Sequence, residues 1–83
     1  MIPLIVPELG LPNDEAIVVS CWLVRRGDVL VEGDRVVELL IGEMTFDVPA
    51  PATGKLVHVT CEVDETVGPG TILGRIQPEK NAD

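Results

Sequence analysis

Few residues in this 83-residue chain could carry out acid–base or nucleophilic chemistry. The chain contains one histidine, His58, two cysteines, Cys21 and Cys61, and no tyrosine. All three side chains fall inside apolar runs, whereas a reactive thiol needs an exposed, electropositive setting. No Cys-x-x-Cys pair or His/Cys cluster is present, so we predict no metal site and no independent enzyme. We expect two buried thiols in a reducing compartment, and a disulfide between them remains an alternative.

The charge balance excludes several classes of partner. Carboxylates outnumber basic side chains by 14 to 6, which gives a net charge of −8 at pH 7. Such a surface repels phosphate backbones, so we expect no nucleic-acid partner. No apolar run reaches the roughly 20 residues of a membrane helix. Residues 1–10 lack the basic start and long apolar stretch of a signal peptide, and we therefore expect a cytoplasmic protein without a membrane contact.

Short apolar runs separated by turns must position these side chains. Eight glycines and seven prolines are spread along the chain, which is typical of many short strands. We predict strands at Ile2–Val6, Ala16–Val24, Val29–Val31, Val36–Leu40, Met44–Val48, Lys55–Val63, Thr66–Val67 and Ile72–Ile76. No stretch has a sustained 3.6-residue apolar period, so essentially no helix is expected. One domain over residues 1–78 and a polar tail over 79–83 complete this prediction.

The chain is organised around Val36–Pro51, which reads as two strands folded back on each other. Apolar residues alternate with polar ones in Met44–Val48, as in a half-buried strand. The turn between the two strands is predicted at Ile41-Gly42-Glu43. Glu43 therefore lies at the tip of a hairpin in the middle of the sequence.

An internal repeat relates the two halves of the chain, with an offset of 37 residues. Its members are Leu30, Gly33, Val36 and Leu39 in the first half, and Val67, Gly70, Leu73 and Ile76 in the second. Upstream, Val6-Pro7 is matched with Val48-Pro49. A glycine permits a tight turn with positive φ, so the apolar residues on either side of it can both point inward. Two such halves predict a sandwich of two sheets packed face to face.

Several segments together resemble the lipoyl/biotinyl carrier domain family, and most closely the lipoyl domains of 2-oxo acid dehydrogenase acyltransferases. They are Val6–Gly10, Trp22–Asp28, Glu32–Leu39 and Asp47–Gly54, in the family's order and spacing. The resemblance covers residues 1–78. It implies an all-β fold, a flattened barrel-sandwich of two four-stranded antiparallel sheets with pseudo-twofold symmetry.

The resemblance fails at one position, the hairpin tip. Members of the family carry lipoate or biotin on a lysine in this turn, within Glu-Thr-Asp-Lys-Ala or Met-Lys-Met. Alignment without gaps from either flank places Glu43 where that lysine belongs, with Gly42 in place of the aspartate and Met44 after it. The only lysines, Lys55 and Lys80, are not at a hairpin tip. We therefore predict no cofactor-binding residue at Ile41, Gly42, Glu43 and Met44, and neither lipoate nor biotin.

Three functions are compatible with this sequence. The favoured one is a non-enzymatic module for protein interaction or assembly, with Leu40 and Ile41 as an exposed apolar pair beside the tip. The alternative is a lipoyl or biotinyl carrier domain of a 2-oxo acid dehydrogenase-type or carboxylase-type multienzyme complex, modified at Lys55 or acting with a modified paralogue. A third, a membrane-fusion or secretion adaptor, would need a helical hairpin that this sequence lacks. A protein partner is expected, with a component of a 2-oxo acid dehydrogenase-type complex as one candidate. Self-association through Ile2–Val6 stays open.

Overall fold

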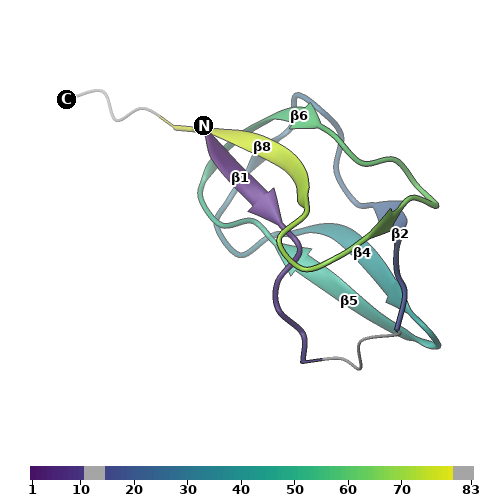
Figure 1. Ribbon diagram of the computed structural model, residues 1–83. Helices are drawn as coiled ribbons and strands as arrows, with labels where there is room; N and C mark the ends of the chain where they lie inside the picture. Colours follow the sequence, from purple (N-terminus) through teal and green to yellow (C-terminus); the bar gives the residue numbers. More distant parts are fainter. Residues whose placement is uncertain (11–14, 80–83) are drawn as a thin grey trace.

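Two four-stranded antiparallel sheets form the molecule (Figure 1). The computed structural model describes residues 1–10 and 15–79, and these ranges contain strands and turns but no helix. The strands are β1 Ile2–Ile5, β2 Ile17–Trp22, β3 Val29–Leu30, β4 Arg35–Ile41, β5 Met44–Pro49, β6 Gly54–Val59, β7 Thr66–Val67 and β8 Ile72–Pro78. One sheet has the order β1-β8-β6-β3 and the other β5-β4-β2-β7. The predicted all-β class and its two sheets are thereby confirmed.

The strand ends differ from the prediction at several places. β6 ends at Val59 instead of Val63, and β2 runs only from Ile17 to Trp22. Each of these strands carries a bulge, where the register shifts by one residue. A bulge bends its strand and ends the simple alternation that the prediction had extended. β8, in contrast, continues through Pro78, which pairs with Gly54 at the start of β6.

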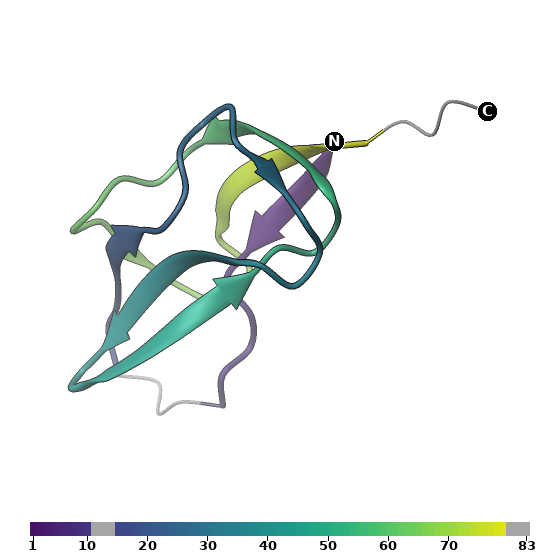
Figure 2. The ribbon, with the colours of Figure 1, turned by 180° about the vertical axis from the view of Figure 1, so that it is seen from behind.

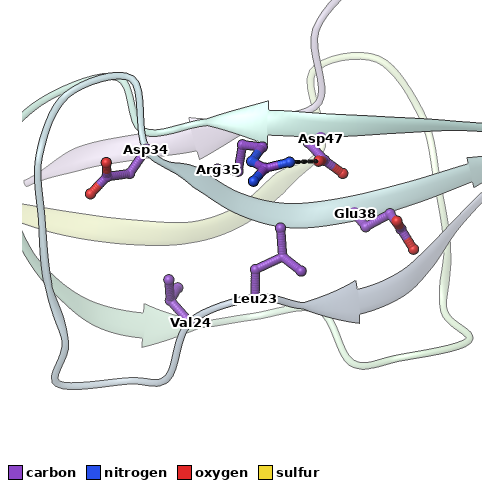
Figure 3. A pocket seen from close by; sticks show the side chains of 6 residues that line it. All are labelled: Leu23, Val24, Asp34, Arg35, Glu38 and Asp47. Atoms are coloured by element: carbon purple, nitrogen blue, oxygen red, sulfur yellow. Dashed lines mark ion pairs between the residues drawn. The ribbon is translucent and has the colours of Figure 1, made fainter.

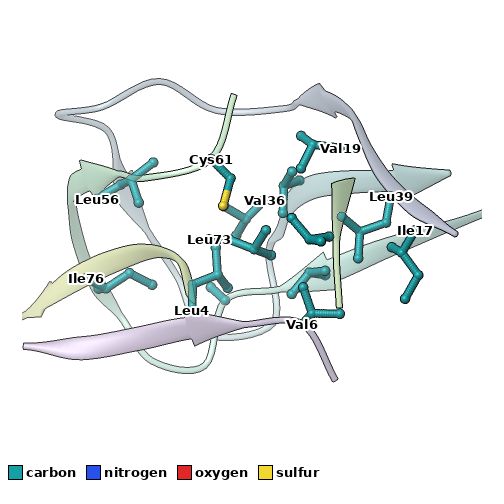
Figure 4. Close-up of a cluster of buried hydrophobic side chains, with 14 of the residues drawn as sticks. Leu4, Val6, Ile17, Val19, Val36, Leu39, Leu56, Cys61, Leu73 and Ile76 are labelled. Atoms are coloured by element: carbon teal, nitrogen blue, oxygen red, sulfur yellow. The ribbon is translucent and has the colours of Figure 1, made fainter. Parts of the chain in front are cut away.

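Aliphatic side chains from both sheets fill the space between them (Figure 4). The completely or almost completely buried ones are Leu4, Val6, Ile17, Val19, Leu30, Val36, Val37, Leu39, Ile41, Val48, Ala50, Leu56, Val67, Leu73 and Ile76, together with Cys61. No charged or polar side chain of the described residues is buried with them. Burial of apolar surface is therefore the main interaction between the two sheets, and the indole N–H of Trp22 adds a hydrogen bond to the carbonyl of Cys61 at 2.9 Å.

The internal repeat is visible in the backbone. All six apolar members of the repeat are buried, and its two glycines, Gly33 and Gly70, have φ of 94° and 84°. The amide of Gly33 donates to the carbonyl of Ala50, and the amide of Gly70 donates to the carbonyl of Val6. These bonds show that Val6 and Ala50 are equivalent positions of the repeat, so the predicted match of Val6-Pro7 with Val48-Pro49 was wrong by two residues. The loop before β2 differs in length from the loop before β6, and the sequence pattern alone therefore did not reveal the correct match.

Turn caps extend the repeat further than the sequence pattern did. A side-chain oxygen of Asp28 accepts the amide of Arg25, and 37 residues later Glu65 accepts the amide of Glu62, at 2.8 and 3.2 Å. Such side-chain bonds fix a turn because they satisfy an amide that no strand partner reaches. The two halves thus share turn geometry as well as core positions.

Candidate functional site

The β4–β5 hairpin ends in a two-residue turn. Ile41 pairs with Met44, which leaves Gly42 and Glu43 as the turn, one residue fewer than predicted. Gly42 has a φ of 61°, whereas Glu43 does not have a positive φ. These signs match a type II′ turn, which prefers glycine at its first central position. The tip lies at the far end of the molecule from the N-terminus (Figure 2), and Glu43 is exposed.

The prediction that Leu40 and Ile41 are both exposed beside the tip is correct for Leu40 and wrong for Ile41. Leu40 is 39% exposed, but Ile41 is only 4% exposed. Successive residues of a strand point to opposite faces, so two neighbours in β4 cannot both face solvent. Ile41 lies between Ile17 of β2 and Met44 of β5 on the core side of the sheet. The exposed apolar side chains near the tip are Leu40 and Met44.

A second carboxylate lies at the tip. A Cβ atom added to Gly42 would lie 2.5 Å from Oε1 of Glu15, so the Glu15 side chain packs against the turn. Residues 1–24 and 36–54 contain no lysine or arginine. The tip therefore presents the carboxylates of Glu15 and Glu43 without a cation from either flanking stretch.

Two further candidate residues, Lys55 and His58, lie away from the tip. Lys55 is exposed on β6, in the other sheet, where it pairs with Val29 and Gln77. His58 is also exposed on β6 and pairs with Arg75. Lys80 lies outside the described residues. The structure thus brings neither Lys55 nor His58 to Glu43.

The two cysteines differ in environment, contrary to the prediction that both are buried. Cys61 is buried, and its thiol donates to the carbonyl of Ile72 at 3.4 Å. Burial, and then the neighbouring Glu65, raise the pKa of Cys61 above its ordinary value. Cys21 is exposed because it follows the bulge in β2. Both thiols are free.

The described residues hold no group of three or more histidine, cysteine, aspartate or glutamate side chains suited to a metal ion. Over the same part of the chain, no helix is long and apolar enough to cross a membrane.

A groove of about 570 Å³ lies on the outer face of the second sheet (Figure 3). Its lining consists of Leu23, Val24, Asp34, Arg35, Glu38 and Asp47. The guanidinium of Arg35 lies 3.6 Å from the carboxylate of Asp47, and the hydroxyl of Ser20 donates to Glu38 at 3.0 Å. Sequence reasoning missed this groove. The feature of the sequence that could have revealed it is the pairing of two acidic residues, Glu38 and Asp47, across the predicted hairpin.

Comparison with known proteins gives a consistent result. The family model Biotin_lipoyl, described as "Biotin-requiring enzyme", matches residues 3–76. Over 74 residues, which make up 89% of the chain, it is 34% identical to the dihydrolipoyllysine-residue acetyltransferase component of the pyruvate dehydrogenase complex of Mycobacterium tuberculosis. It is 32% identical over 72 residues, 87% of the chain, to the dihydrolipoyllysine-residue succinyltransferase component of the 2-oxoglutarate dehydrogenase complex of Bartonella vinsonii. The chain spans only 13% and 17% of these two relatives.

A solved structure shares the fold. The lipoyl domain of the 2-oxoglutarate dehydrogenase complex of Azotobacter vinelandii superimposes with a TM-score of 0.72, at 18% sequence identity. The superposition covers 93% of this chain and 99% of that one. The likeness supports the two-sheet fold over most of this chain.

Proposed function

This chain belongs to the biotinyl/lipoyl-attachment family, and on that premise we propose that it is a member without the attachment lysine that serves protein interaction or assembly. The observation that carries the proposal is Glu43 on the exposed two-residue turn between β4 and β5. Attachment of lipoate or biotin forms an amide with a lysine ε-amine. A glutamate offers no amine, and its charge is opposite to that of lysine.

The rest of the tip supports the same reading. Glu15 brings a second carboxylate against Gly42, and no basic residue is found in the flanking segments. Leu40 and Met44 add exposed apolar surface on either side of the turn. An acidic tip with apolar flanks is suited to contact with a protein surface. We propose that the domain itself is not catalytic and binds no metal, lipoate or biotin.

The relatives that are components of dehydrogenase complexes favour an alternative, a carrier domain of a 2-oxo acid dehydrogenase-type or carboxylase-type complex. The acceptor would then be Lys55, which lies within strand β6 and is paired with Val29 and Gln77. A lysine held in a paired strand moves less freely than one on a turn, and this argues against Lys55. In either case a component of such a complex is a candidate partner. We place the protein in the cytoplasm, in keeping with its two free thiols.

Intact mass spectrometry of the protein from cells with active lipoate and biotin ligases tests the proposal. The expected mass is that of the unmodified sequence, while a lysine-bearing lipoyl domain from the same cells serves as the positive control. A lipoyl or biotinyl adduct at Lys55 or Lys80 would overturn the proposal in favour of the carrier alternative.

A further inference from the structure

The groove on the outer face of the second sheet combines apolar and acidic surface. Leu23, which follows β2, is 46% exposed and points toward β4 (Figure 3). Three carboxylates line the same groove, those of Asp34, Glu38 and Asp47. The single cation of the lining is Arg35, so the lining carries a net charge of −2. A volume of about 570 Å³ is within the range of sites that hold a few side chains or a small ligand.

The internal ion pair leaves most of this negative charge available. Arg35 lies 3.6 Å from Asp47, and its side chain is 77% exposed. Such an exposed pair is weak, and it engages only one of the three carboxylates. Glu38 and Asp34 each accept one hydrogen bond, from Ser20 and from the amide of Val31. A carboxylate has about four acceptor sites, so both retain capacity for a cationic donor.

The internal repeat shows that the fold does not require these side chains. Leu23 and Thr60 are equivalent, because their amides donate to the carbonyls of Val36 and Leu73 in the two halves. The second half therefore builds the same backbone with a small hydroxyl residue where the first half exposes a leucine.

The fold does not require a negative charge at Asp34 or Glu38. Asp34 caps the amide of Val31 at 2.9 Å, and 37 residues later Thr71 caps the amide of Gly68 at 3.1 Å without a charge. Glu38 is paired with Cys21 in β2, while its counterpart in the second half is a basic residue, Arg75. The fold therefore does not explain why the groove is apolar at Leu23 and acidic at Asp34 and Glu38.

We propose that this groove binds a basic segment of a partner protein, with arginine or lysine side chains directed at Glu38 and Asp34 and an apolar side chain against Leu23. Charge complementarity selects this occupant. A second copy of the chain carries the same net charge of −8 and is repelled, and so is a nucleic-acid backbone. The site is separate from the hairpin tip and does not depend on whether any lysine is modified.

An NMR titration of the ¹⁵N-labelled protein tests the proposal. The probe is a capped peptide containing Arg-Ala-Leu-Ala-Arg, and the control peptide has glutamate in place of both arginines. We expect saturable shifts confined to amides around Leu23, Glu38 and Asp47 with the basic peptide, weakening as salt is raised. The control peptide should cause none. No saturation at millimolar peptide, or shifts spread over the whole acidic surface, would overturn the proposal.

Matched variants separate a specific site from general electrostatics. Leu23→Thr combined with Glu38→Gln removes the apolar contact and one charge, and we expect about tenfold weaker binding, the scale of one lost charge-assisted contact. Glu62→Gln removes the same charge from an exposed position outside the groove and should change the affinity by less than about twofold. Equal losses in both variants would contradict the proposal. A homodimer in sedimentation experiments that the groove variant abolishes would identify a second copy as the occupant and would also contradict it. An adduct found by mass spectrometry would instead overturn the proposed function and leave this site standing.

Discussion

Gly27 and Asp64 occupy equivalent places in the two halves, and both have a left-handed backbone, with φ of 100° and 74°. The amide of Gly27 donates to the carbonyl of Leu56, and the amide of Asp64 donates to the carbonyl of Val19. Each residue thus ties its turn to the neighbouring long strand. Glycine adopts this conformation without steric cost, whereas a side chain with a Cβ atom does so at a cost. Aspartate is among the residues that tolerate it best.

The first prediction follows from this equivalence. Gly27→Ala should lower the free energy of unfolding by about 1 kcal/mol. The added methyl group would contact no atom within 4 Å, so the loss reports the backbone conformation alone. Urea unfolding followed by Trp22 fluorescence measures it. Asp64→Gly is the matched change in the opposite direction and should be neutral or stabilising, by up to about 0.5 kcal/mol. A clearly destabilised Asp64→Gly would show that the Asp64 side chain, and not its φ, matters.

A second prediction concerns the close approach of two strands in the first sheet. A Cβ atom at Gly54 would overlap the backbone carbonyl of Gln77 in β8 and crowd Pro78. Backbone cannot move aside as a flexible side chain does, so Gly54→Ala should cost about 2–3 kcal/mol. Gly68→Ala is the control, because its added methyl group meets nothing within 4 Å and its φ is not positive. Urea unfolding that ranks the two variants equally would contradict the register between β6 and β8.

The sequence was sufficient for the fold where two signals coincided. The repeat placed Leu30 and Val67 in the core, because a positive-φ glycine three residues later fixes the direction of the chain in each half. The sequence did not predict features that leave no periodic pattern of apolar residues. The bulge in β2 exposes Cys21, and no single residue type announces a bulge. The groove was missed because it forms between Leu23 and Glu38, which are brought together only by the pairing of β2 with β4.

A third prediction separates the two thiols by reactivity. Cys21 is exposed and Cys61 is buried, with its pKa raised by burial and by Glu65. Iodoacetamide at neutral pH should therefore label Cys21 in the folded protein and Cys61 only after unfolding, because the thiolate is the reactive form. Peptide mapping after a timed reaction distinguishes the two sites. Equal labelling of both cysteines under native conditions would contradict the burial of Cys61.

The same thiol gives a fourth prediction, on the pH dependence of stability. The pKa of Cys61 is higher in the folded than in the unfolded protein, so the folded state holds this proton to higher pH. Its contribution is complete below the ordinary thiol pKa of about 8.5 and is lost as pH rises through the folded value. Free energies of unfolding measured from pH 7 to pH 10 should fall more steeply for the native sequence than for Cys61→Ala. Parallel curves for the two proteins would show that other groups cause the decline.

The fifth prediction tests whether the hairpin kept the shape of a carrier. Glu43→Lys puts an amine on the exposed two-residue turn, and we expect lipoate ligase to acylate this variant but not the native protein. The reaction should be slower than with a lysine-bearing lipoyl domain, because the alignment predicted from the sequence puts Gly42 where the family motif has aspartate, and because Glu15 packs against Gly42. Intact mass measured over time gives the rates.

Lys55→Arg combined with Glu43→Lys assigns the site of that reaction. Arginine keeps the positive charge on β6 but cannot form the amide, so an adduct that persists in the double variant lies either on the turn or on Lys80, and peptide mapping distinguishes the two. An adduct lost with Lys55 would move the acceptor to β6 and support the carrier alternative. A folded Glu43→Lys protein that stays unmodified on prolonged incubation would show that the ligase also depends on the residues beside the lysine, among them Gly42 and the apolar flanks of the turn.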